Sequence, residues 1–171
     1  MRLYLVRHGQ TKWNEERIYQ GHTDIPLNQY GMSEALLLRE KIKSKEIDVC
    51  ISSPLKRAIQ TAAIITENKM NIITDSLLIE QNLGIYEGTK YNINTSIAYS
   101  PNNGVESMDH LFIRAERFLD SIYQNYEDKT VLVVSHGSLI RAIHFQIIGY
   151  SEDEDLLKFD VPNCCLLEYD L

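Results

Sequence analysis

The 171-residue sequence has few of the features that mark secreted, disordered or membrane-spanning proteins. Its three cysteines are an odd number, which cannot form the even disulfide framework of a small secreted domain. Eight glycines and four prolines are too few for long low-complexity tracts. The apolar run at residues 3–6 ends at Arg7, far short of a signal peptide core or of the roughly 18 apolar residues of a membrane span. These absences predict one globular domain over residues 1–171 in a reducing, cytoplasmic setting, with no membrane partner.

Positive charge is also scarce. Seventeen Lys and Arg face 24 Asp and Glu, which gives a net charge of −7, and the pI is about 5.2. A basic surface of the kind that binds nucleic acid non-specifically is therefore not expected, and we predict no nucleic-acid partner. An anionic ligand would have to meet a local cluster of positive groups. The oligomeric state cannot be predicted from the sequence.

Hydrophobic patterning predicts strands that alternate with helices. The helices are amphipathic, with apolar residues repeating at spacings of three and four, and Asn28 and Pro54 stand where two of them would begin. This order predicts an α/β fold: a three-layer α/β/α sandwich with a mostly parallel central sheet. The expected strands are 2–6, 49–52, 71–74, 131–134 and 164–169, and the expected helices are 29–44, one from Pro54, 107–126 and one around 139–147. Residues 81–104 are expected to form an irregular segment that covers the substrate.

Polar residues follow three of these strands at the edge where ligands gather in parallel sheets. Two arginines and two histidines stand at those strand ends or shortly after them, at Arg7, His8, Arg57 and His136. Phosphate suits such a cluster, because arginine holds its oxygens with two parallel hydrogen bonds, and the helix that starts at Gly137 adds backbone N–H groups. Neighbouring positive charge lowers the pKa of a histidine and keeps it neutral, and a neutral imidazole is a nucleophile.

Six blocks of the chain resemble the histidine phosphatase superfamily, also called phosphoglycerate mutase-like. The first block is Arg7-His8-Gly9-Gln10-Thr11 with Asn14 three residues on. The others follow in the order of the family, at 19–31, 52–62, 78–88, 104–107 and 134–137. Together the blocks cover nearly the whole chain.

The resemblance implies a role for each matching residue. His8 would attack phosphorus and carry a transient phosphohistidine, while Arg7, Arg57 and His136 surround the phosphoryl oxygens. Phosphate-binding positions would include Asn14, Gln20, Gly21 and Gly137.

Glu80 matches the general acid of the family, and Glu87 in the same segment is the alternative. Glu106 and Ser107 stand at a helix start, where Ser107 would cap the helix and Glu106 would touch the ligand or serve only the helix start. No metal or cofactor is expected, because fixed positive groups supply most of the catalysis in phosphoryl transfer and the remaining histidines lack zinc-site spacing.

The short stretch between the blocks at 78–88 and 104–107 favours a phosphatase over a mutase. Residues 89–103 contain no arginine and only one lysine, Lys90, whereas mutases carry a longer insertion there that shields the phosphoenzyme from water. The expected substrate is a small phosphorylated metabolite, with α-ribazole 5′-phosphate, phosphoserine and sugar phosphates as candidates. Apolar stretches at 85–86 and 97–99 suggest packing against a ring. The alternatives are a cofactor-dependent phosphoglycerate mutase and a non-catalytic phosphate-binding domain.

Overall fold

The computed structural model describes residues 1–91, 102–151 and 155–171 of the chain. A five-stranded sheet runs through its middle in the order β3-β2-β4-β1-β5. Four strands are parallel to one another, and β5 pairs antiparallel with β1 at the edge. The strands are β1 (Arg2–Arg7), β2 (Val49–Ser52), β3 (Ile72–Thr74), β4 (Thr130–Ser135) and β5 (Leu166–Asp170). The predicted mostly parallel sheet is confirmed.

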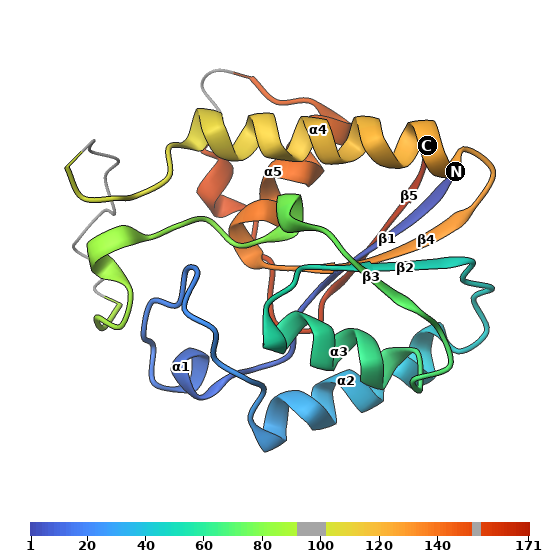
Figure 1. The fold of residues 1–171 in the computed structure, drawn as a ribbon, viewed down its shortest axis with the longest axis horizontal. Helices are drawn as coiled ribbons and strands as arrows, with labels where there is room; N and C mark the ends of the chain where they lie inside the picture. Colours follow the sequence, from blue (N-terminus) through green and yellow to red (C-terminus); the bar gives the residue numbers. More distant parts are fainter. Residues whose placement is uncertain (92–101, 152–154) are drawn as a thin grey trace.

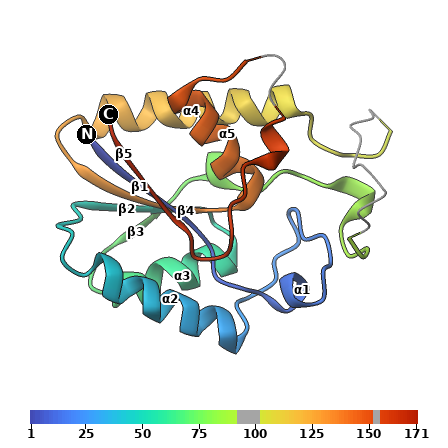
Figure 2. The ribbon, with the colours of Figure 1, turned by 180° about the vertical axis from the view of Figure 1, so that it is seen from behind.

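Helices cover both faces of the sheet (Figure 1). One face carries α2 (Gln29–Ile42) and α3 (Lys56–Ile65), and the other carries α4 (Met108–Tyr126) and α5 (Gly137–Ile148). Both ribbon views place the chain termini side by side at one end of the sheet (Figure 2), where the Met1 ammonium donates to the Leu171 carbonyl at 2.7 Å. The three-layer α/β/α arrangement is therefore confirmed.

The two central strands, β1 and β4, are apolar between their terminal residues because both of their faces are buried. In β1, Leu3 and Leu5 pack in the cluster beneath α4 and α5, whereas Tyr4 and Val6 pack in the cluster beneath α2 and α3. Strand β4 alternates in the same way. Side chains of a strand point to opposite faces in turn, so continuous apolar runs are what a doubly covered parallel sheet requires.

Helix starts agree with the predicted caps in two cases and differ in one. The side chain of Asn28 accepts from the Gly31 N–H at the start of α2, and Ser107 caps α4. Pro54 was expected as the first residue of a helix, but α3 begins at Lys56, so this prediction was wrong by two residues. The Lys56 N–H donates to a carboxylate of Asp24 at 2.7 Å, which supplies the first turn with an acceptor from a distant loop.

Two further elements differ from the expected pattern. The four-residue helix α1 (Lys12–Glu15) was not predicted, although Thr11 and Asn14 form a capping box at its start. The last strand begins at Leu166 rather than at 164, because Cys164 adopts a left-handed conformation with φ of 52° and turns the chain before it pairs. Cys164 and Cys165 then pack on opposite faces of the sheet.

The segment expected to be irregular is so in its described part. It contains the one-turn helix η2 (Gly84–Tyr86) and an isolated bridge from Leu83 to Val105. Residues 97–99 lie outside the described residues.

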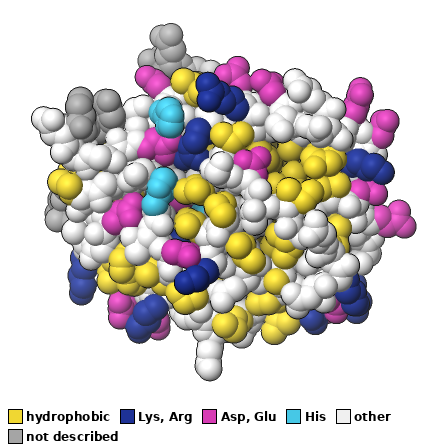
Figure 3. All heavy atoms as spheres, viewed as in Figure 1, with side chains coloured by type: hydrophobic (Ala, Val, Ile, Leu, Met, Phe, Trp, Pro, Cys, Tyr) yellow, Lys and Arg dark blue, Asp and Glu magenta, His cyan; other side chains and the backbone are white. Residues whose placement is uncertain are grey.

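None of the helices in the described chain combines the length and the apolar character needed to cross a membrane. Acidic and basic side chains are interspersed over the face in Figure 3, with histidines among them.

We predict that α4 stabilises the fold through its buried face alone. Phe118→Ala should lower the free energy of unfolding by about 3–5 kcal/mol, because the ring is fully buried and a cavity would remain. Ile113→Ala on the same helix removes a side chain that is 44% exposed and should change stability by less than about 1 kcal/mol. Urea denaturation measures both, and equal losses would contradict this packing.

Candidate active site

A cavity of about 1220 Å³ opens at the carboxyl ends of the central strands. Strand register brings the ends of β1 and β4 level, because Arg7 pairs with Ser135, and the residues that follow them meet there. Eight of the nine predicted site residues line the cavity: Arg7, His8, Asn14, Gln20, Gly21, Arg57, Glu80 and Gly137. His136 is fully buried, with its ring centroid 5.1 Å from that of His8.

His8 is fixed in one tautomer. Its Nδ1 lies 2.7 Å from the Gly9 carbonyl oxygen, which can only accept, so Nδ1 carries the proton. Nε2 therefore keeps its lone pair. Only 2% of His8 is exposed, and its backbone N–H donates to the Ser135 carbonyl, which ties the end of β1 to the end of β4.

Arg57 and His136 form a buried pair in which the histidine is the acceptor. The Arg57 Nε donates to Nδ1 of His136 at 3.2 Å, so His136 carries its proton on Nε2 and donates it to Ser53 Oγ at 2.7 Å. The terminal nitrogens of Arg57 donate to the carbonyls of Thr23 and Gly21, each at 2.8 Å. Each terminal nitrogen has a second hydrogen, which the described carbonyls leave unused.

Arg7 lines the cavity and keeps one donor without a partner in the described chain. Its Nη1 donates to the Val161 carbonyl, but its buried Nε–H has no hydrogen-bond partner in the described chain. Neither Arg7 nor Arg57 forms an ion pair with a carboxylate within the described residues, and the carboxylates that act on Arg57 do so from beyond ion-pair distance. A buried donor and two unpaired cations are what an anion such as phosphate would satisfy.

Burial and the arginines keep both histidines neutral. Burial, followed by the charges of Arg7 and Arg57, holds the pKa of His8 well below its ordinary value. The pKa of His136 is lowered in the same way, by burial first and then by Arg57. Burial lowers the pKa of Arg57 to about 10, so its guanidinium stays charged at neutral pH.

The two amide side chains at the cavity are anchored through their oxygens. Asn14 Oδ1 accepts from the backbone N–H of Thr11 at 3.0 Å, and Gln20 Oε1 accepts the hydroxyl hydrogen of Thr11 at 2.8 Å. Within the described residues, neither amide nitrogen makes a hydrogen bond. Both are thus available as donors to a ligand in the cavity.

The two candidate acids occupy different surroundings. Glu80 lines the cavity, and its carboxylate accepts from the Ser138 N–H in the first turn of α5 at 3.1 and 3.3 Å. Glu87 does not line the cavity, and its oxygens accept four hydrogen bonds from His22, Thr23 and Leu83. Burial alone would raise the pKa of Glu87, but these hydrogen bonds outweigh it and hold the pKa below its ordinary value.

Comparison with known proteins assigns the family. The model of the histidine phosphatase superfamily (branch 1) matches residues 3–171. The chain belongs to this superfamily. It is 37% identical over 166 residues to the protein named uncharacterized phosphatase PhoE of Bacillus subtilis, covering 95% of this chain and 84% of that one. Phosphoserine phosphatase 1 of Hydrogenobacter thermophilus is 33% identical over 172 residues, covering 93% and 80%.

A solved structure of YhfR from Bacillus stearothermophilus superposes with a TM-score of 0.89 at 28% identity, covering 99% of this chain and 91% of that one. Relatives carry both phosphatase and phosphoglycerate mutase names. Membership and the phosphatase-named relatives support the expected enzyme class, a phosphatase of the histidine phosphatase type.

Some residues of this histidine phosphatase site were not predicted from the sequence. Arg141 lines the cavity and donates to the Phe159 carbonyl, while Asn163 donates to the His8 carbonyl at 2.9 Å. His22 is exposed, and its Nε2 donates to the Glu80 carbonyl at 2.8 Å. These contacts join residues far apart in sequence, and no local pattern signals them.

One expectation about the ligand-facing residues was wrong, and one stays a prediction. Residues 85–86 do not line the cavity, and Ile85 is 69% exposed. Aromatic and aliphatic cover comes instead from Trp13, Ile18, Tyr19, Leu83 and Tyr91. Glu106 was expected to touch the ligand or to serve only the helix start, and it does line the cavity. Its carboxylate accepts from Arg114 and lies 2.6 Å from Nδ1 of His110, and contact with a ligand stays a prediction.

A metal site does not emerge from the described residues, which hold no group of three or more His, Cys, Asp or Glu side chains placed to bind an ion. Independence from metals and cofactors stays a prediction.

We predict that His8 makes folding stability depend on pH. The folded pKa lies well below that of the unfolded chain, about 6.5, so the unfolded chain takes up a proton first as pH falls. The contribution of His8 to the free energy of unfolding is therefore full above about pH 6.5. Below that pH it falls by about 1.4 kcal/mol per pH unit, because the unfolded chain binds one more proton. His8→Asn should reduce the slope between about pH 6 and pH 5 by roughly that amount.

Urea denaturation at a series of pH values measures these slopes. Thr61→Ser is the matched control, because Thr61 accepts from the Gly9 N–H next to His8 and the substitution keeps the hydroxyl. It should keep the wild-type slope. If His8→Asn has the same dependence of unfolding free energy on pH as the wild type, His8 has the same pKa in the folded and unfolded states, and the prediction is wrong.

Proposed function

We propose that this histidine phosphatase is a metal-independent phosphomonoester hydrolase that acts through a phosphohistidine on a small phosphorylated metabolite. The observation that carries the proposal is His8: a buried, neutral imidazole with a free Nε2 lone pair, lining the same cavity as two arginines that have no carboxylate partner. A nucleophile beside unpaired cations is suited to attack on a phosphoryl group.

In the first step, His8 Nε2 forms a bond to phosphorus as the bond to the leaving oxygen breaks. Negative charge in the loose transition state spreads over the three equatorial oxygens. The Nε–H of Arg7, the unused hydrogens of Arg57 and the amide nitrogens of Asn14 and Gln20 supply donors for those oxygens. These groups are fixed before the substrate binds, so little reorganisation is needed.

The leaving oxygen takes its proton from Glu80 in this scheme. The resulting carboxylate accepts from the Ser138 N–H, and it then receives a proton from the water that attacks the phosphohistidine. The second step breaks the bond between nitrogen and phosphorus, releases inorganic phosphate and restores protonated Glu80. Glu87 is unsuited to this role, because four hydrogen bonds from the fold stabilise its charged form.

The cavity offers room and an apolar wall for the leaving group. Its volume of about 1220 Å³ greatly exceeds that of a phosphate, and the rings of Tyr19 and Tyr91 lie 5.1 Å apart on its wall. This wall favours a leaving group with a ring, as in α-ribazole 5′-phosphate. Phosphoserine is the second candidate, because a relative carries that name and Arg141 on the wall could hold a carboxylate.

We predict that the protein releases inorganic phosphate in the presence of EDTA. The panel contains p-nitrophenyl phosphate, α-ribazole 5′-phosphate, phosphoserine, sugar phosphates and 3-phosphoglycerate. His8→Ala should lower turnover at least about 1000-fold, because it removes the nucleophile. His144→Gln, a histidine stacked on Phe159 outside the cavity, serves as the matched control.

Each outcome of this panel assigns a function. If the wild-type protein loses its turnover in EDTA, the reaction depends on a metal. If His8→Ala keeps full turnover, His8 is not the nucleophile. Transfer of phosphate to a second glycerate without release would support a mutase. Binding of phosphate esters without turnover would support a non-catalytic phosphate-binding domain.

We predict that Glu80 and Glu87 have separable effects. Glu80→Gln should lower kcat/KM for phosphoserine by about 100-fold or more, because an alkoxide leaves poorly without a proton. Its effect on p-nitrophenyl phosphate should be under about tenfold, because p-nitrophenolate leaves unprotonated. Glu87→Gln should lower thermal stability and affect both substrates alike. The reverse pattern would make Glu87 the acid.

A further inference from the structure

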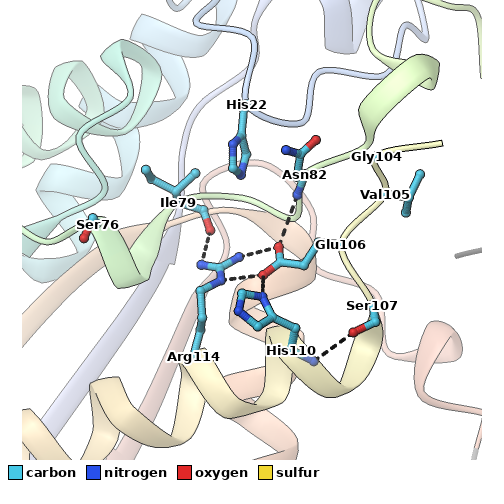
Figure 4. Close-up of a pocket in the computed structure, with 10 residues that line it drawn as sticks. All are labelled: His22, Ser76, Ile79, Asn82, Gly104, Val105, Glu106, Ser107, His110 and Arg114. Atoms are coloured by element: carbon cyan, nitrogen blue, oxygen red, sulfur yellow. Dashed lines mark hydrogen bonds and ion pairs between the residues drawn. The ribbon is translucent and has the colours of Figure 1, made fainter. Parts of the chain in front are cut away.

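A second cavity, of about 650 Å³, lies behind the segment that carries Glu80 (Figure 4). Arg114 reaches into it from α4, and His22 points toward it from the opposite side. Ile79, Asn82 and Glu106 lie between them on its wall. The cavity therefore contacts the backbone on both sides of the proposed general acid.

Arg114 binds the backbone that leads into and through Glu80. Its Nη1 donates to the carbonyls of Leu77 and Ile79 at 2.7 and 2.8 Å, and its Nη2 donates to the Glu80 carbonyl at 3.3 Å. The side chain is only 12% exposed. One guanidinium thus fixes three carbonyl groups within four residues.

Glu106 holds Arg114 and the backbone that follows Glu80. Its two carboxylate oxygens accept from Nε and Nη2 of Arg114 at 2.7 and 2.8 Å, in the bidentate geometry that fixes a guanidinium most firmly. The same carboxylate accepts from the Asn82 N–H, and the Glu106 backbone pairs with Asn82 and with the Gln81 side chain. Residues on both sides of Glu80 are therefore tied to one ion pair.

The carboxylate of Glu80 has no side-chain partner of its own in the described chain. It accepts from the backbone N–H groups of Gln81 and Ser138. Its position at the cavity thus depends on where its backbone is held relative to α5. Arg114 and His22 both donate to its carbonyl and set that position.

We propose that the Arg114–Glu106 pair is a positioning device for the general acid, which places Glu80 against the N-terminus of α5. Glu106 also lines the larger cavity, whereas Arg114 does not. This inference rests on the role of general acid that was proposed above for Glu80. Displacement of a catalytic group by about 1 Å can cost about 100-fold in rate. A loosened pair should therefore impair protonation of the leaving group while His8 and the arginines remain in place.

The test compares two substrates that differ in their need for an acid. Glu106→Gln keeps the shape of the side chain and weakens the ion pair, and Arg114→Lys keeps the charge but loses the bidentate fork. Each should lower kcat/KM for phosphoserine by about 10–100-fold and for p-nitrophenyl phosphate by under about threefold. Arg39→Lys, at the exposed pair with Glu40, is the matched control and should change neither value.

A double variant separates positioning from structural support. In a Glu80→Gln background, Glu106→Gln should cause no further loss with phosphoserine, because the acid is already absent. Equal losses on both substrates, or losses that add to those of Glu80→Gln, would overturn the proposal in favour of a general structural role.

A second readout is independent of turnover. The backbone amide resonance of Ser138 reports its hydrogen bond to the Glu80 carboxylate, and it should shift in Arg114→Lys and in Glu106→Gln but not in Arg39→Lys. An unchanged Ser138 resonance in both variants would refute the positioning role whatever the kinetics. If wild-type protein hydrolyses no substrate, the proposed function fails, and the Ser138 resonance still decides the positioning.

Discussion

The burial of Arg57 without a negative partner is the constraint on which the rest of the site depends. Its guanidinium is fully buried, and its acceptors are two carbonyl oxygens and the neutral Nδ1 of His136. These groups accept three of its hydrogen bonds but carry no negative charge, and the carboxylates of Glu80, Asp24 and Glu87 act on it only from beyond ion-pair distance. Burial is the main cause of the lowered pKa of both His8 and His136, and the Arg57 charge adds to it, so this buried cation attracts an anion and also helps to keep the nucleophile neutral.

The loop that supplies those carbonyls is held by residues with no part in the chemistry. Glu87 accepts from the backbone of His22 and Thr23, and Asp24 accepts from the first N–H of α3. Gly21 has a φ of 52°, and a Cβ there would lie 2.2 Å from Glu87 Oε1. Gly21 and Glu87 therefore depend on each other, and together they hold the carbonyls of Gly21 and Thr23 in place to accept from Arg57.

The sequence predicted the elements and the main residues, but not the contacts that orient them. Arg7, His8 and His136 could be placed because each follows a continuous apolar strand, and parallel strands bring their ends together. The proton positions on the two rings depend on the Gly9 carbonyl and on Arg57, which no local pattern specifies. The start of α3 was misplaced for the same reason, because its acceptor lies 32 residues away.

The indirect role of Arg114 follows from what a general acid must do. A carboxyl group that is paired directly with a guanidinium gives up its proton, because the neighbouring charge stabilises the carboxylate. Arg114 instead directs its charge to Glu106 and meets Glu80 only at the backbone carbonyl, at 3.3 Å. The fold can thereby use an arginine to hold the acid in place while leaving the acid without an ion pair in the described chain. The backbone contacts of Arg114 thus set the position of the acid, while its carboxylate is left to accept from the Ser138 N–H.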